Sequence, residues 1–157
     1  MSFRVVSIPC EISQKARETL MSPQFSGMKA DVSVANGYGP CRSCLEVFKQ
    51  GEDERIYITY NSFAGIADLP DPGPIFIHKR KCERFEESEF PSDLLDLPLL
   101  FEAFGEESRL ISREKLDADE VGLQIENIFS NPAVRFINLR NAEAGFFVAR
   151  VERDNLD

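Results

Sequence analysis

The sequence lacks tryptophan, has a single histidine and contains no long hydrophobic run among its 157 residues. A helix that spans a membrane needs about 20 consecutive apolar residues, and no segment approaches that length. Residues 1–8 are too few, and too interrupted by Arg4, to form the hydrophobic part of a signal peptide. These absences predict a soluble, cytoplasmic protein with no membrane partner.

Basic residues are also scarce. Eighteen Lys and Arg stand against 27 Asp and Glu, which gives a formal net charge of −9. Residues 83–157 carry a net charge of −10, whereas residues 1–82 carry +1. Nucleic-acid binding depends on Lys and Arg that neutralise phosphates, and the one basic cluster, residues 79–84, is typical of a solvated turn. We therefore expect no nucleic-acid partner.

Several catalytic signatures are missing as well. The sequence has neither a P-loop nor a Gly-x-Gly-x2-Gly run, so nucleotide binding has no support from a motif. Pro40-Cys41-x2-Cys44 resembles half of the zinc deaminase signature. That chemistry needs His-x-Glu, with the Glu as proton shuttle, and here Arg80 stands two residues after His78. We exclude a deaminase on this ground.

What is present indicates an ordinary globular chain. Hydrophobic residues make up 43% of it, and thirteen are Phe. A chain of this length buries about two-thirds of its unfolded surface, so we predict a single domain over residues 1–157. The expected fold class is α+β with a mostly antiparallel sheet. It comprises a metal-stapled lobe over about residues 30–90 and a β-β-α-β-β lobe over about residues 97–153.

The first half alternates short apolar runs with loops. Residues 3–8 predict a strand, and Pro9 opens a helix over about residues 10–20. Two apolar runs on either side of residues 51–54 predict a hairpin. Residues 64–74 are a Pro- and Gly-rich loop, and the short apolar run that follows it delivers His78.

The second half has a clearer pattern. Residues about 97–104 and 108–116 predict two strands. Asp117 and Glu120 have the spacing of a capping box before a helix that ends at Asn131-Pro132. Two more strands follow, at about residues 134–140 and 146–152. Local connections of this kind favour an antiparallel sheet with helices on one face.

Cysteine carries the sharpest chemical signal. Cys41-x2-Cys44 is followed, after thirty-three residues, by His78-x3-Cys82. Thiols clustered in a reducing compartment are more often metal ligands or redox catalysts than disulfides. Zinc takes four thiolate or imidazole donors at tetrahedral corners, and residues four apart on a helical turn face the same way. Two such pairs predict one closed zinc site on Cys41, Cys44, His78 and Cys82.

The order of ligands is similar to that of treble-clef zinc folds, in which a cysteine turn, a hairpin and a helical turn follow one another. Many such turns place Gly after the second Cys, where φ is positive. Leu45 occupies that position here and would be strained there. Arg42, Lys79, Arg80 and Lys81 are the nearest basic residues in sequence and could offset the charge of three thiolates.

Three segments also resemble a known family. They are Gly39-Pro40-Cys41-Arg42-Ser43-Cys44-Leu45, Gly73–His78 with Cys82-Glu83-Arg84, and Arg140-Asn141-Ala142-Glu143-Ala144-Gly145. They resemble a bacterial family of uncharacterised proteins, domain of unknown function 1203, over nearly the whole chain. The resemblance implies a small bacterial protein whose Cys and His positions are a shared feature. It implies no activity, substrate or partner.

Four protein donors around one zinc favour a structural role, because catalytic zinc keeps one position open for water. The sequence therefore favours a zinc-stabilised binding or interaction protein whose partner is an unidentified protein or small molecule. Two enzyme alternatives stay open: a zinc with an exchangeable ligand, and Cys41 with Cys44 as a thiol redox centre. The ligand types alone do not separate zinc from iron.

Two further features have a simple structural explanation. Cys10 begins the first predicted helix, where the helix dipole could lower its pKa, but a small buried apolar role is favoured. Glu143 with Arg140 and Asn141 could line a pocket, and a tight hairpin turn explains Asn141 and Gly145 without a function. With His78 used as a ligand, a Ser-His-Asp triad has no base.

Overall fold

The structure is a computed structural model that describes residues 3–37, 39–62, 73–143 and 145–154. The chain divides into two compact units, one formed by Met1–Val6 with Phe85–Asp157 and the other by Ser7–Arg84. We call them the sheet unit and the metal unit. The metal lobe expected over about residues 30–90 thus belongs to a unit that begins at Ser7. The grouping of the whole chain into one domain stays a prediction.

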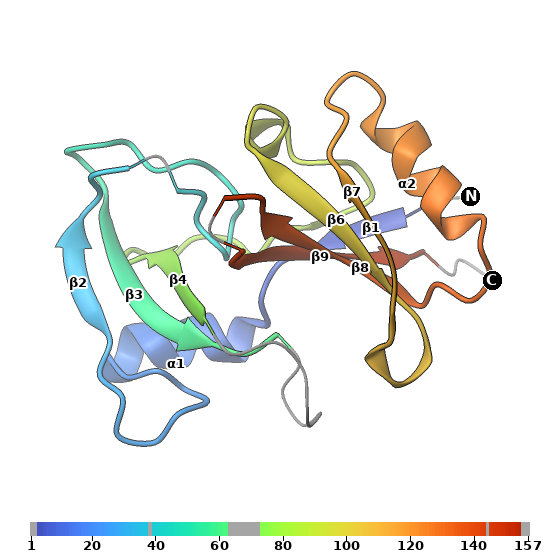
Figure 1. Cartoon of the computed structure of the whole chain (residues 1–157). Helices are drawn as coiled ribbons and strands as arrows, with labels where there is room; N and C mark the ends of the chain where they lie inside the picture. Colours follow the sequence, from blue (N-terminus) through green and yellow to red (C-terminus); the bar gives the residue numbers. More distant parts are fainter. Residues whose placement is uncertain (1–2, 38, 63–72, 144, 155–157) are drawn as a thin grey trace. The chain divides into compact units, whose positions relative to one another are not determined.

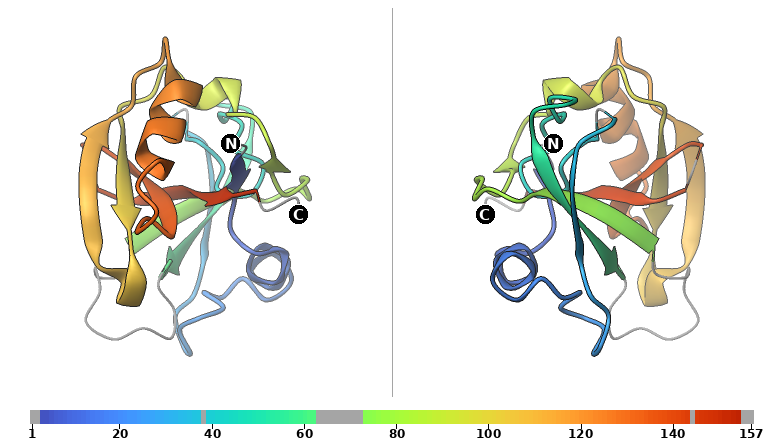
Figure 2. Two further views of the ribbon diagram at one scale, coloured as in Figure 1. Left: turned by 90° about the vertical axis from the view of Figure 1, so that its right-hand side faces the viewer. Right: turned by 90° about the vertical axis from the view of Figure 1, so that its left-hand side faces the viewer.

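The metal unit is built on three antiparallel strands and one helix (Figure 1). Helix α1 spans Cys10–Thr19, and the strands, in the order β2-β3-β4, span Asp31–Val34, Glu54–Tyr60 and Gly73–His78. The β3 sequence alternates, so that Ile56, Ile58 and Tyr60 are buried while Tyr57 is exposed. Figure 2 views α1 almost end-on beside these strands.

Helix α1 agrees with its predicted position, and its first turn has a local cause. Pro9 takes the N-cap position, and its carbonyl accepts hydrogen bonds from the N–H groups of Ile12 and Ser13. Proline is favoured at a helix start because its missing N–H would have no partner there. The helix ends at Leu20, which adopts a left-handed conformation with φ of 52°. The predicted Pro- and Gly-rich loop at residues 64–74 lies mostly outside the described residues.

The predicted hairpin around residues 51–54 is wrong in one strand. Residues 45–49 form no strand, and β3 pairs instead with β2 and with β4. Phe48 explains the difference, because its side chain is buried against the His78 ring at a centroid distance of 4.7 Å. The segment therefore packs onto the candidate metal centre and does not pair as a strand.

The sheet unit contains a six-stranded sheet in the order β5-β1-β9-β8-β6-β7 (Figure 1). Every described pair of neighbouring strands is antiparallel. The strands span Phe3–Val6 (β1), Glu86–Glu87 (β5), Leu99–Phe104 (β6), Leu110–Lys115 (β7), Phe136–Asn141 (β8) and Phe147–Arg153 (β9). Two short 3-10 turns cover Ser92–Leu94 and Glu106–Ser108, and helix α2 covers Val121–Phe129. The predicted β-β-α-β-β order is confirmed.

One face of this sheet forms the core of the unit. Its buried side chains alternate along the strands and stand opposite one another in register: Val5, Phe101, Ala103, Ile137, Leu139, Ala149 and Val151. Helix α2 covers this face with Ile125, Ile128 and Phe129, and Arg153 places its guanidinium 4.6 Å from the centre of the Phe129 ring. Neither described helix is long and apolar enough to cross a bilayer.

The predicted capping box before α2 is wrong. The helix begins at Val121 with Glu120 as N-cap, and no side chain caps it. The Asp117 carboxylate instead accepts a hydrogen bond from the N–H of Asp119 at 3.1 Å, and the Asp117 N–H donates to Gln124. Asp117 therefore closes a local turn ahead of the helix. A short acidic side chain can bond the backbone in such a turn instead of capping the helix.

Candidate metal centre

The first two candidate ligands lie on a tight turn in the metal unit. The Leu45 N–H donates to the Cys41 carbonyl and the Cys41 N–H donates to the Glu46 carbonyl, both at 2.9 Å. These bonds close the turn around Cys41 and Cys44. Cys41 is fully buried, whereas Cys44 is partly exposed.

Leu45 adopts the strained conformation that its position predicts. Its φ is 61°, in the left-handed region, where a residue other than glycine costs about 1–2 kcal/mol. The side chain is 1% exposed, and burying a leucine stabilises a fold by about 1.5–3 kcal/mol. Burial therefore offsets the backbone strain, which explains how the turn tolerates a leucine.

Gly39 leads into the same turn with φ of 100°. A Cβ atom at Gly39 would lie 2.5 Å from Cδ2 of Phe48. Phe48 in turn packs edge-on against His78, so glycine at position 39 lets an aromatic wall close over the histidine. The close packing of Phe48 therefore requires glycine at position 39, shortly before Cys41.

Strand β4 delivers the third candidate ligand. Ile75 and Ile77 are buried on β4, and His78, its last residue, is 1% exposed. Cys82 follows after a bend at residues 79–80, in a segment without helix. The helical turn expected at residues 78–82 is therefore wrong. The cysteine-turn, hairpin and second-pair order of a treble clef is kept, with a strand end and a loop in place of that turn.

The four predicted donors come together. The ligand atoms of Cys41, Cys44, His78 and Cys82 all lie within 4.8 Å of one another, although the residues span 41 positions. Cys41 Sγ and Cys82 Sγ are 3.9 Å apart, and Cys44 Sγ and His78 Nδ1 are 3.4 Å apart. In a tetrahedral zinc site with ordinary bond lengths, sulfurs lie about 3.8 Å apart and sulfur and nitrogen about 3.6 Å apart. The residues thus fit a tetrahedral metal ion.

A disulfide does not explain this cluster. All four cysteines of the chain are free, and the 3.9 Å between Cys41 and Cys82 is far beyond an S–S bond of about 2.05 Å. Cys10 lies on α1, partly exposed, and is not part of the cluster. The thiols are therefore available as ligands.

A carboxylate holds the histidine from its far side. Asp53 Oδ2 lies 3.3 Å from His78 Nε2, while Nδ1 faces Cys44. A metal-bound histidine commonly donates its other ring N–H to a carboxylate, which fixes the tautomer and the ring plane. This assigns Nδ1 as the ligand atom and Nε2–H as a donor to Asp53. Arg80, 3.4 Å from Nε2, then adds charge and no hydrogen bond.

An arginine from α1 also reaches the cluster. Arg17 donates through one terminal nitrogen to Cys82 Sγ at 3.1 Å and through Nε to the His78 carbonyl at 3.0 Å. Among the residues expected to balance the thiolates, Arg42 donates to the Pro40 carbonyl and Lys79 faces Glu54. Sequence reasoning missed the contacts of Arg17 and Asp53, since neither residue has a motif.

The thiols and the imidazole of the cluster shift one another's pKa values. A hydrogen bond with Cys41 leads the causes that lower the pKa of Cys82, and a hydrogen bond with Cys41 also leads those that raise the pKa of Cys44. Burial lowers the pKa of His78, but bonds with Cys41 and Cys82 outweigh it and raise this pKa to about 10. Negative charge on sulfur is thus balanced by protons, a role that a divalent cation can take over.

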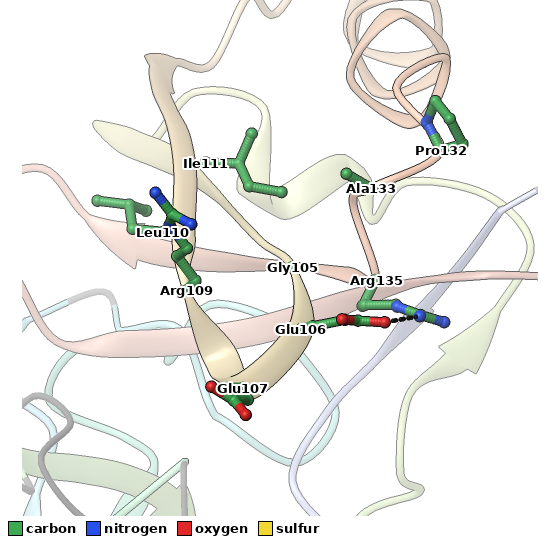
Figure 3. A pocket seen from close by; sticks show the side chains of 9 residues that line it. All are labelled: Gly105, Glu106, Glu107, Arg109, Leu110, Ile111, Pro132, Ala133 and Arg135. Carbon is green, nitrogen blue, oxygen red and sulfur yellow. Dashed lines mark hydrogen bonds and ion pairs between the residues drawn. The ribbon is translucent and has the colours of Figure 1, made fainter.

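The sheet unit holds a cavity of another kind (Figure 3). It measures about 1060 Å³ and is lined by Gly105, by Ile111 of β7 and by the segment after α2. Glu106 and Arg135 form an ion pair at 2.7 Å, with both side chains more than half exposed. A solvent-exposed ion pair of this kind contributes little to the stability of the fold. No His or Cys lines the cavity. It carries no catalytic arrangement among the described residues.

The hairpin turn between β8 and β9 accounts for Arg140, Asn141 and Gly145 without a functional role. Asn141 Oδ1 accepts a hydrogen bond from the Glu143 N–H at 2.9 Å, and Arg140 donates to the Gly145 carbonyl at 2.9 Å. Gly145 has φ of 77°, which suits glycine. The turn that the sequence favours at Asn141 and Gly145 is therefore present.

The fold and the donor cluster define an α+β protein with a candidate metal centre. The chain belongs to the family described as protein of unknown function (DUF1203), whose model matches residues 38–153. The resemblance predicted from the motifs is thus confirmed, and the matched range includes all four candidate ligands and Asp53. No curated protein and no solved structure matches the chain.

Proposed function

We propose that this chain is a binding or interaction protein whose metal unit is held together by one structural zinc ion on Cys41, Cys44, His78 and Cys82. The observation that carries the proposal is the convergence of four donor atoms within 4.8 Å from a turn, a strand end and a loop. Metal binding and folding are coupled in sites of this kind, because the ligands come together only in the folded chain. The zinc would fix the turn, β4 and the loop to one another.

Zinc is favoured by the donor set. Three thiolates and one imidazole, at separations that suit a tetrahedron, match structural zinc sites of the Cys3His type. Three thiolates leave a Zn²⁺ centre with a formal charge of about −1. The Arg17 guanidinium, which donates to Cys82 Sγ, offsets this charge. Iron in the same sulfur-rich site is the alternative that metal analysis distinguishes.

A structural role is favoured over catalysis for two reasons. Four protein donors complete the tetrahedron, whereas catalytic zinc uses three and keeps the fourth position for water or substrate. Two of the four donors, Cys41 and His78, are at most 1% exposed. A redox role for the Cys41-Cys44 pair is disfavoured by the same burial, because a thiol that attacks a disulfide must be accessible.

X-ray absorption at the zinc edge tests the coordination directly. The proposal expects a shell of three sulfurs and one nitrogen in protein purified without added metal. A shell of two or three protein donors with an oxygen would instead favour the catalytic alternative. The redox alternative has its own assay, since metal-free protein would then reduce a small disulfide with a rate that depends on Cys41. The partner, whether a protein or a small molecule, is identified separately by co-purification.

A further inference from the structure

Strand β2 forms an open edge of the three-stranded sheet in the metal unit, where it pairs with β3 alone among the described strands (Figure 1). All four of its residues, Asp31–Val34, are exposed. Val32 is 37% exposed and Val34 is 52% exposed. The two side chains point to the same face, because side chains alternate along a strand. The edge therefore presents two valines to solvent.

The backbone of this edge also has hydrogen-bonding groups that β3 does not use. The Ala35 N–H donates to the Asp53 carbonyl at 2.8 Å, and this pair continues the register of β2 on β3. The N–H and C=O groups of successive residues point to opposite sides of a strand, so those of Val32 and Val34 point away from β3. Within the described residues, no other segment takes up these groups.

The other edge strands of the two sheets are protected against pairing. Strand β7 ends in three charged residues, 113–115, and β5 has only two residues. The outer side of β4 is covered at Phe76, whose carbonyl accepts a hydrogen bond from the Arg42 N–H at 2.9 Å. Charged side chains, very short edges and covering segments all prevent edge-to-edge contact. Strand β2 has one charged residue, Asp31, at its first position, so its valines lack this protection.

The outward backbone groups select one register for pairing with a second copy of the chain. In an antiparallel pair with two-fold symmetry about Ser33, Val32 lies opposite Val34 of the second copy, and Val34 opposite Val32. Both valines of each strand then use their N–H and C=O groups in the ladder. A register centred on Val32 would need the outer side of Ala30, whose N–H already donates to the Leu20 carbonyl at 2.8 Å.

The same register places compatible side chains opposite one another. Each Val32 faces a Val34, and apolar cross-strand pairs stabilise a sheet. On the other face Ser33 meets its own copy, and Asp31 lies opposite Ala35, so no like charges meet. The metal unit has ten basic and ten acidic residues, so two such units do not repel one another through net charge. Strand β2 is therefore complementary to itself.

We propose that two copies of this chain associate through β2, as antiparallel edge strands related by a two-fold axis at Ser33. The two three-stranded sheets then form one continuous sheet. Main-chain hydrogen bonds supply the affinity, as they do wherever a strand adds to an exposed sheet edge. Each copy contributes only the four residues of β2, so the interface is small and the dimer is weak. No step of the proposal uses the metal ion.

Sedimentation equilibrium of the full chain as purified tests the association. We expect the average mass to rise from that of one chain, 17.8 kDa, toward twice that value between about 10 µM and 1 mM. A mass that stays at one chain over this range would overturn the proposal. Growth beyond two chains would also overturn it, because a closed two-fold contact stops at the dimer. Metal content is measured in the same samples, so the outcome is separate from the zinc proposal.

Matched lysine variants locate the contact. Val34→Lys places a charge on the proposed edge. Leu123→Lys places the same charge on α2 in the other unit, at a residue that is 51% exposed against 52% for Val34. A charge on an edge strand opposes pairing, and it occurs twice in a symmetric dimer. We expect the dissociation constant to rise by about tenfold or more in Val34→Lys and to stay unchanged in Leu123→Lys. Equal dissociation constants in the two variants would contradict the site.

Cysteine cross-linking tests the register in chains that carry Cys10→Ser, which removes the thiol outside the candidate metal centre. Ser33→Cys faces its own copy in a non-hydrogen-bonded pair, where Cα atoms lie about 4.5 Å apart, within reach of a disulfide. Asp31→Cys is the matched control, because its two copies lie about 14 Å apart. With oxidised glutathione we expect covalent dimers of Ser33→Cys above the level of Cys10→Ser alone, and none above it in Asp31→Cys. Equal yields in the two cysteine variants would overturn the proposal, and this comparison decides it if circular dichroism shows that Val34→Lys unfolds.

Discussion

His78 is held on both sides of its ring. Cys44 Sγ lies 3.4 Å from Nδ1, and Asp53 Oδ2 lies 3.3 Å from Nε2. The Asp53 carboxylate is itself fixed, because it accepts a hydrogen bond from the Lys49 N–H at 2.9 Å. That bond is the leading cause of the lowered pKa of Asp53, and its contact with His78 contributes in the same direction. A small local network thus orients one candidate ligand.

Removing the charge of Asp53 is predicted to weaken metal binding without unfolding the protein. In Asp53→Asn the amide is a poorer acceptor for the His78 N–H, so the ring is held less firmly. Loss of such a contact typically costs 10–100-fold in metal affinity, and competition with a chromophoric chelator measures it. Glu54→Gln is the matched control, because the Glu54 side chain is exposed and forms an ion pair with Lys79. Equal affinity in the two variants would contradict this role.

Leu45 allows a second test at single-residue scale. At most positions glycine is less stable than alanine, by about 0.5–1 kcal/mol inside regular elements. At φ of 61° the order should reverse, because glycine relieves the left-handed strain that alanine keeps. We predict that Leu45→Gly is more stable than Leu45→Ala by about 1 kcal/mol in urea unfolding, with both below the unchanged protein. If Leu45→Ala proves more stable than Leu45→Gly, the backbone of this turn is not strained.

The cluster of four candidate donors could be predicted from the sequence because each pair is encoded locally. Two cysteines three positions apart and a histidine four positions before a cysteine are visible as spacing. Asp53 and Arg17 could not be predicted, because they reach the centre only through tertiary contacts across 25 and 65 positions. The positive φ of Leu45 was foreseeable from the cysteine turn, but the burial that offsets it was not.

At the scale of elements, one side chain connects α1 to the candidate metal centre. Arg17 stands in the last turn of α1 and reaches both the His78 carbonyl and Cys82 Sγ. Arg84, just beyond Cys82, donates to the carbonyls of Ser7 and Ile8, which precede the helix. The segment before α1 and the last turn of α1 therefore both contact the segment that carries the last two candidate ligands.

Metal removal is predicted to loosen α1 and the 78–84 segment first. After exhaustive chelation, amide hydrogen exchange in these two regions should become at least about tenfold faster, because their shared contacts open without global unfolding. Strands β6, β8 and β9 belong to the other unit and serve as the internal reference. Uniform acceleration in both units, or no change in α1, would contradict the assignment of the metal to the Ser7–Arg84 unit.

Periodic elements were predictable, and elements defined by packing were not. Helix α1 and strands β6 to β9 follow the spacing of their apolar residues, and the structure places them within a few positions of the predictions. The segment at residues 45–49 reads as a strand by its alternation, yet Phe48 turns toward His78. The segment after His78 reads as a helical turn by its ligand spacing, yet a bend places Cys82. In both cases the tertiary contact outweighs the local pattern.

At the scale of the whole molecule, charge is distributed unequally between the two units. The metal unit has ten basic and ten acidic residues, whereas the sheet unit carries a net charge of −9. The fold class and the β-β-α-β-β order of elements along the second half followed from the sequence, because the spacing of apolar residues marks each element. The absence of a nucleic-acid partner stays a prediction from the acidic balance.

The central claim is that one zinc ion binds Cys41, Cys44, His78 and Cys82. Elemental analysis of protein purified without added metal tests it most directly, with Cys82→Ser beside the unchanged chain and Cys10→Ser as a matched control. We predict one zinc per chain in the unchanged protein and in Cys10→Ser. In Cys82→Ser we predict less than about a tenth of that, with a melting temperature lower by about 10 °C or more. Full zinc retention in Cys82→Ser, or no metal in any sample, would contradict the account.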